Sequence, residues 1–158
     1  ISLGVWLYGT CVRGTAGHQQ LVPITLLGTG RASIISKVQT INVHRGSQST
    51  LYESVLAGYR ALQKDYDPAA AQSLVVFTNR DRDTTSGMSL ESLITRLEAE
   101  SDPSKPIRVM GVGFGERADV RGLQRVSDAM GGKSARVDGP VAMLGLFINM
   151  IGQVSAQG

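Results

Sequence analysis

The stretch that decides the fold is IRVMGVGFGERADVRGLQRVSDAMGG, residues 107–132. Its first eight residues are almost all apolar or glycine, a pattern typical of a strand that is buried on both faces. Asp119 then begins a segment in which Leu123, Val126 and Met130 recur at helical spacing, and Gly131 suits the end of that helix. A buried strand followed by an amphipathic helix is the repeating unit of α/β proteins.

The same unit recurs on both sides of this stretch. Upstream lies the all-apolar run SLVVFT, residues 73–78, followed by a helix that Ser89 is placed to cap. The expected strands are 1–9, 20–27, 73–78, 107–114 and 134–137, and the expected helices are 31–41, 51–64, 90–100, 119–130 and 141–154. The alternation predicts one domain over residues 1–158, with a doubly wound, mostly parallel sheet and helices on both faces. Pro23 favours an edge position for its strand.

Composition excludes several classes of protein. The chain has 158 residues, of which 42% are hydrophobic and 18% charged, so a folded domain is expected and a disordered chain is not. The net charge of +3 gives little support to nucleic-acid binding. No apolar run approaches the roughly 18 residues of a membrane span. The single cysteine, Cys11, excludes an internal disulfide and any cysteine-built metal site.

Oxygen-bearing side chains gather where strands are expected to end. In an open α/β sheet, ligands bind beyond the carboxyl ends of the strands, and segments 46–50, 78–83 and 113–119 fall there. Hydroxyl and carboxylate oxygens suit a hard cation such as Mg²⁺, Mn²⁺ or Ca²⁺. The competing interpretation is that Ser49 and Thr50 cap a helix, and that Asp81 and Asp83 are solvated loop charges.

Other residues support a ligand site less well. Gly111, Gly113 and Gly115 have the spacing GxGxG, which suggests a nucleotide-binding, Rossmann-type enzyme domain as an alternative. The dinucleotide fingerprint needs a further glycine, and no P-loop lysine is present, so close packing of strand and helix is the competing explanation. His18, His44 and Cys11 lie in segments expected to be loops, and no GxSxG elbow exists. No catalytic residue is predicted.

Four segments in chain order resemble the von Willebrand factor A (vWA) domain. They are STLYESVLAGYRALQ (49–63), SLVVFTNRDRD (73–83), GMSLESLITRL (87–97) and the stretch 106–137. The resemblance is closest to vWA domains at the C-terminal end of bacterial, mainly actinobacterial, surface proteins. It implies a protein-interaction module rather than an enzyme, located outside the cell or attached to its surface.

The resemblance also implies a metal-ion-dependent adhesion site at the carboxyl edge, which would hold Mg²⁺ or another divalent cation. This sequence departs from the family pattern there, because no DxSxS is present and Asn79 stands where the family has an aspartate. Ser49 matches the family's threonine, and Thr50, Thr78 and Asp81 are second choices as ligands. Losing a negative charge weakens hard-cation binding, so the expected site is degenerate or absent.

The chain begins in a segment that resembles the second strand of the vWA fold. The domain is therefore expected to be incomplete at its N-terminus and to lack its central strand. A sheet without that strand would expose two apolar edges. We expect an upstream segment or a second chain to supply the missing strand, in addition to a protein partner at the carboxyl edge.

Overall fold

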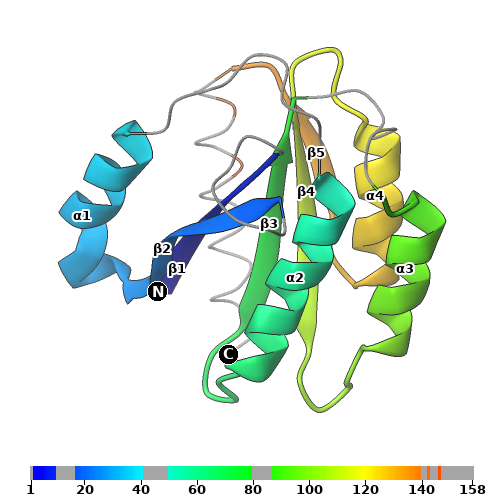
Figure 1. Ribbon diagram of the computed structural model, residues 1–158, viewed down its shortest axis with the longest axis horizontal. Coiled ribbons are helices and arrows are strands. Elements are labelled where there is room, and N and C mark those ends of the chain that lie inside the picture. The colour runs from blue at the N-terminus through cyan, green and yellow to red at the C-terminus, as the bar shows by residue number, and fades with distance from the viewer. Residues whose placement is uncertain are drawn as a thin grey trace.

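The computed structural model describes residues 2–9, 17–40, 50–79 and 87–139, together with the helical positions Ala142 and Leu146. The chain has an α/β fold, as predicted (Figure 1). Its elements are β1 (Ser2–Tyr8), β2 (His18–Leu26), α1 (Leu27–Gln39), α2 (Leu51–Lys64), β3 (Gln72–Thr78), α3 (Leu90–Ala99), β4 (Ile107–Phe114), α4 (Val120–Ala129) and β5 (Ser134–Val137). The predicted helix 141–154 falls almost wholly outside the described residues.

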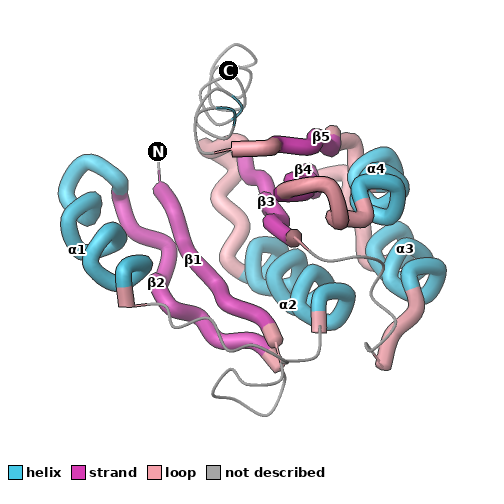
Figure 2. The backbone as a smooth tube through the Cα atoms, turned by 90° about the horizontal axis from the view of Figure 1, so that it is seen from above, coloured by secondary structure: helices cyan, strands magenta, loops and turns pink. Residues whose placement is uncertain are grey.

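The larger sheet contains three parallel strands in the order β3–β4–β5. Val75 pairs with Met110 across β3 and β4, and Gly111 pairs with Ser134 across β4 and β5. Helices α2, α3 and α4 all lie on one face of this sheet (Figure 2). The doubly wound arrangement predicted helices on both faces, and the described helices that pack on this sheet lie on one of them.

β1 and β2 form a separate antiparallel hairpin, and α1 packs against β2. The described strands therefore make two sheets, with no ladder between β1 and β3. The carboxyl ends of these two strands nevertheless meet, because the Tyr8 hydroxyl donates a hydrogen bond of 3.0 Å to the Phe77 carbonyl oxygen.

The core lies between the three-stranded sheet and its helices. Each helix contributes one apolar stripe, as the 3.6-residue spacing predicted. The buried residues are Leu51, Tyr52, Val55, Leu56 and Tyr59 of α2, Leu90, Leu93 and Leu97 of α3, Leu123, Val126 and Met130 beside or within α4, and Val76, Ile107 and Val109 of the sheet. No helix within the described ranges has both the length and the apolar character needed to cross a bilayer.

The helix ends follow the sequence where a polar cap marks them. Ser89 Oγ accepts a hydrogen bond of 3.1 Å from the Ser92 amide, and Asp119 Oδ1 accepts one of 2.9 Å from the Gly122 amide. The predicted start of the first helix at residue 31 was wrong, since α1 begins at Leu27. The chain passes straight from β2 into α1 without a side-chain cap, so no sequence signal marks that start.

A surface ion pair joins α2 to α3. Arg60 Nε donates to Glu100 Oε2 over 2.7 Å, and this bond holds the pKa of the Glu100 carboxyl below its ordinary value of 4.5. A lowered folded-state pKa means that the pair stabilises the fold above the ordinary glutamate pKa. That contribution is lost as the pH falls through the lowered pKa.

We predict a pH-dependent effect of Glu100→Gln. Because Arg60 and Glu100 are 52% and 34% exposed, the loss in free energy of unfolding at pH 7 should be about 0.5 kcal/mol. It should vanish at a pH well below 4.5 and shrink in high salt. Urea denaturation at both pH values measures it. An equal loss at low pH would mean that the glutamine disturbs packing instead.

Candidate functional site

Strand ends and a helix start converge at the carboxyl edge of the fold (Figure 1). The end of β1 connects them, because Tyr8 contacts Phe77 of β3 and Gly9 contacts Thr50 at the start of α2. Thr78 and Asn79 follow Phe77 directly. Three of the predicted site residues, Thr50, Thr78 and Asn79, therefore lie along one edge. Ser49 and Asp81 lie outside the described residues, and their roles as ligands stay predictions.

The Thr50 hydroxyl ties together the two ends of the β1–β2 connection. Its Oγ1 accepts a hydrogen bond of 3.0 Å from the Gly9 amide and donates one of 2.6 Å to the Gly17 carbonyl oxygen. Gly9 N also donates to Gly17 O over 2.8 Å. Thr50 occupies the N-cap position of α2, as predicted, although its side chain makes no cap hydrogen bond. The hydroxyl instead bonds to the main chain of Gly9 and Gly17, which are far from Thr50 in the sequence.

Glycine is the only residue type that fits at position 17, next to Thr50. Its φ of +68° lies in the left-handed region, and a Cβ there would stand 2.6 Å from Thr50 Cγ2. The hairpin backbone can thus approach Thr50 closely enough for the Gly17 carbonyl oxygen to accept a hydrogen bond from its hydroxyl. The sequence alone gives no signal for this contact, because residues 17 and 50 are far apart in the chain.

Thr50→Val should loosen this closure while keeping the side-chain shape. The substitution leaves the Gly9 amide and the Gly17 carbonyl without their hydroxyl partner, which should lower the free energy of unfolding by about 1 kcal/mol. Faster amide exchange confined to residues near Gly9 and Gly17 is the expected signature. Thr95→Val on the exposed side of α3 is the matched control. Unchanged exchange near Gly9 would contradict the closure.

Glu53 is an edge residue whose contact the sequence did not reveal. It lies in the first turn of α2, where a negative charge interacts favourably with the helix dipole. In the structure its Oε1 also accepts a hydrogen bond of 3.0 Å from the Met88 amide. The carboxylate therefore anchors the segment that leads into α3.

The oxygen atoms available to a cation at the carboxyl edge carry little negative charge. Thr78 is buried, Asn79 is exposed and offers a neutral amide, and the Thr50 hydroxyl is already engaged with the hairpin. Among the residues that the structure describes, no group of three or more His, Cys, Asp or Glu side chains is arranged to hold a metal ion. Hard cations prefer several carboxylate oxygens, so the described residues alone make a weak cation site.

Packing against α4 explains two of the three glycines in the GxGxG stretch. A Cβ on Gly111 would lie 2.7 Å from Leu123 Cβ, and one on Gly113 would lie 2.8 Å from both Ala118 Cβ and Val120 Cγ2. Both positions face α4 or the loop before it, and a Cβ on Gly111 would also overlap Ser134 Oγ on β5, so neither has room for a side chain. This geometry favours the packing explanation over a phosphate-binding loop.

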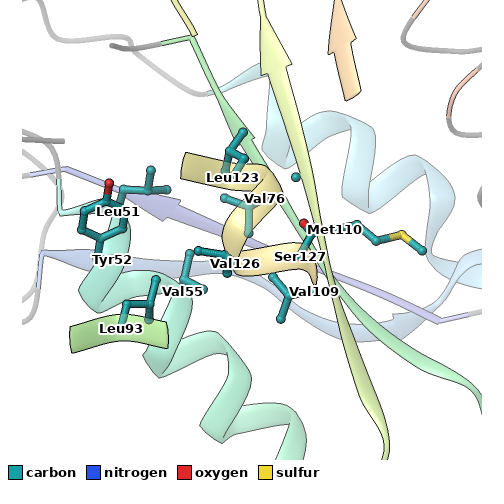
Figure 3. Close-up of a pocket in the computed structure, with 11 residues that line it drawn as sticks. Leu51, Tyr52, Val55, Val76, Leu93, Val109, Met110, Leu123, Val126 and Ser127 are labelled. Atoms are coloured by element: carbon teal, nitrogen blue, oxygen red, sulfur yellow. The ribbon is translucent and has the colours of Figure 1, made fainter. Parts of the chain in front are cut away.

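The core of the described part of the protein contains a small apolar cavity. This cavity, between the sheet and α2, α3 and α4, has a volume of about 10 Å³, enough for about one water molecule (Figure 3). Its lining includes Val55, Leu93, Val109 and Val126, which are all apolar. Sites for small molecules usually enclose some hundreds of Å³. This cavity is therefore too small to be a small-molecule site.

His18 was predicted to lie in a loop, and this prediction was wrong. It begins β2, is partly buried, and stacks on Trp6 with ring centroids 5.1 Å apart and planes 13° from parallel. The stack lies across the hairpin, close to the Gly9–Gly17 closure. His44 and Cys11 lie outside the described residues.

Comparison with known proteins gives a likeness in fold. No protein-family model matches the sequence, and no curated protein matches it. The structure is similar to the crystal structure of the conserved hypothetical protein BatB from Bacteroides thetaiotaomicron, with a TM-score of 0.71 and 12% sequence identity. The match covers 98% of this chain and 80% of that one. The fold is an α/β fold of the vWA/Rossmann-like type. At this identity the likeness shows the fold alone.

Proposed function

We propose that this chain is a vWA-like protein-interaction module whose adhesion-type metal site is degenerate or absent. The observation that carries the proposal is the composition of the carboxyl edge. Phe77 lies next to the last residue of β3 and Phe114 is the last residue of the neighbouring strand β4. They are 36% and 38% exposed, and the exposed Asn79 follows β3 directly. Aromatic side chains are common anchors in protein interfaces. An exposed edge with aromatic anchors and a neutral amide suits a protein surface better than a cation.

The partner in this proposal is a protein bound outside the cell or at its surface, and the chain performs no catalysis. The apolar cavity in the core is too small for a substrate, and this supports a binding role. The location follows from the family resemblance. A metal-free edge would bind its partner through aromatic contact and hydrogen bonds to Asn79, without a shared cation.

Calorimetry with Mg²⁺ and Mn²⁺ tests the metal part of the proposal. We expect no heat of binding and no shift in melting temperature for the intact protein, because the Asn79 position supplies no charge. Asn79→Asp restores a carboxylate and is the variant in which any binding should first emerge. Tight Mg²⁺ binding by the unmodified protein would refute a degenerate site.

The interaction part is tested by comparing captured partners between variants. The double variant Phe77→Ala/Phe114→Ala removes both aromatic anchors, whereas Thr95→Ala changes an exposed residue on α3. Quantitative mass spectrometry should find partners that the edge variant loses and the control keeps. Equal recovery with both variants would place the interaction elsewhere or remove it. Far-UV circular dichroism and melting temperature confirm that both variants are folded.

The proposal includes a strand between β1 and β3, supplied by an upstream segment or a second chain. Three observations support it. β1 pairs only with β2 and β3 only with β4 among the described strands, although their ends meet at Tyr8 and Phe77. No residue of β1 is fully buried, although Leu3, Val5, Trp6 and Leu7 are apolar. Apolar strands with open edges favour pairing with another strand.

Sedimentation velocity and amide exchange test this strand. In the 158-residue chain alone, the open edges of β1 and β3 should exchange rapidly, and the chain should self-associate as its concentration rises. A polypeptide that supplies the strand should protect both edges and suppress the self-association. A strictly monomeric chain with slow exchange along both strands would show that no strand is needed.

A further inference from the structure

The aromatic rings of Trp6 and His18 stack on each other across the β1–β2 hairpin. Their centroids are 5.1 Å apart and their planes are 13° from parallel. Both side chains are partly buried. A cation within about 6 Å of a ring centroid is attracted by the π face of the ring, and tryptophan offers the strongest such face. The stack therefore gains attraction when the imidazole takes up a proton.

Few other charges surround this stack. Neither β1 nor β2 contains Asp, Glu, Lys or Arg. The charged and titratable residues on the elements packed against the hairpin are Tyr8 of β1, Arg31 and Lys37 of α1, and Tyr52, Glu53, Tyr59, Arg60 and Lys64 of α2. Glu53 already accepts a hydrogen bond from the Met88 amide, and Arg60 is paired with Glu100. Among the side-chain types in and around the stack, histidine is the one that ordinarily changes charge between about pH 5 and 8.

The stack lies where the hairpin is bonded to the rest of the protein. The residues at the connected end of the hairpin, here named the hairpin end, are Tyr8, Gly9, Gly17 and His18. The Thr50 hydroxyl bonds to both glycines at the start of α2 (Figure 2). Tyr8 pairs with His18 across the ladder, and its hydroxyl donates a hydrogen bond of 3.0 Å to the Phe77 carbonyl oxygen. The hairpin end is thus tied to α2 and β3, which supply Thr50 and Phe77 to the carboxyl edge.

We propose that His18 is a pH-sensitive switch that tightens the hairpin end when it is protonated. The charged imidazole binds the indole face more strongly than the neutral imidazole does, so the hairpin end opens less often at low pH. This stabilisation is lost as the pH rises and the proton leaves. A tighter hairpin end also holds Thr50 and Phe77 more firmly, so the carboxyl edge becomes more rigid in mild acid. The switch does not depend on the proposed protein partner.

Fluorescence of the intact protein tests the stack, because Trp6 is the single tryptophan and the chain has two histidines. A protonated imidazole in contact with an indole quenches its emission. We expect the emission of Trp6 to fall in one step as the pH is lowered from about 8 to about 5. His18→Gln should abolish the step, whereas His44→Gln removes the other histidine and should keep it. A step that is missing from the unmodified protein, or that persists in His18→Gln, would overturn the proposal.

Amide exchange tests whether protonation tightens the hairpin end. After correction for the intrinsic pH dependence of exchange, the Gly9 amide should open about two- to fivefold less often at about pH 5.5 than at about pH 8, the size of one cation–π contact. The Gly111 amide donates to the Lys133 carbonyl oxygen over 3.1 Å in the other sheet, and as the internal control it should not change.

Two variants assign this effect to the stack. Trp6→Leu keeps the histidine and removes the π face, so the opening of the Gly9 amide should lose its pH dependence in this variant as well as in His18→Gln. A pH dependence that survives in Trp6→Leu, or that is absent from the unmodified protein, would refute the switch. Far-UV circular dichroism at both pH values establishes that a variant is folded, and either variant alone suffices for the exchange test.

Discussion

Gly132→Ala should lower the free energy of unfolding by roughly 3 kcal/mol, because the added methyl group has no space. A Cβ at this position would overlap the Val109 carbonyl oxygen and would lie 2.7 Å from the Val109 carbonyl carbon. These are backbone atoms of the central strand β4, so they cannot move aside as a flexible side chain would. Gly132 N also donates to the Ser127 carbonyl oxygen over 2.8 Å, which fixes the turn after α4.

Chemical denaturation of Gly132→Ala and Gly139→Ala measures this effect against a matched control. A Cβ on Gly139 would have no atom within 4 Å, so its substitution should change stability by less than about 0.5 kcal/mol. Equal stability of the two variants would show that β4 and the turn at Gly131–Gly132 are not packed as described. Loss of the folded state in Gly132→Ala alone would agree with the expected direction.

Leu93→Ala should cost about 3 kcal/mol of stability, in the range typical of leucines in a packed core. Leu93 is fully buried on α3 and lines the small cavity beside Val55, Val109 and Val126. Truncation would enlarge a space that the surrounding side chains already fail to fill. The cost should therefore fall in the middle or upper part of the usual range, because little collapse is available.

Leu26→Ala is the control for this core substitution. Leu26 is 60% exposed, so removing the same atoms should change the free energy of unfolding by less than about 0.5 kcal/mol. Thermal unfolding followed by circular dichroism compares the two. A small effect at Leu93 would indicate that α3 does not pack on the sheet through this residue, in contradiction to the core described above.

The sequence predicted helices, strands and caps correctly where local preferences and tertiary packing favour the same structure. α2 matches its predicted bounds because an apolar stripe with helical spacing coincides with a buried face. β4 matches because its eight residues, all apolar or glycine except Arg108, suit a central strand. Ser89 and Asp119 act as caps because their partners are amides three residues later. In each case the decisive contacts are close in the chain.

The start of α1 and the role of Thr50 could not be predicted in this way. α1 begins without a side-chain cap. Position 30 requires glycine, because a Cβ there would overlap Thr25 Cγ2 on β2. The sequence around Thr50 indicates a helix cap, yet its hydroxyl forms hydrogen bonds with Gly9 and Gly17 of a hairpin that is distant in the sequence. The roles of Ser49 and Asp81 remain predictions, as does the identity of any cation.

By itself, the sequence determined the α/β class, the order of its elements and the apolar stripes that form the core. These features follow from side-chain periodicity and from caps whose partners are near neighbours in the chain. Only the tertiary structure decided that the described strands form two sheets, that Thr50 closes the hairpin, and that α1 is left exposed. The physical reason is that strand pairing, long-range hydrogen bonds and burial depend on which distant segments meet.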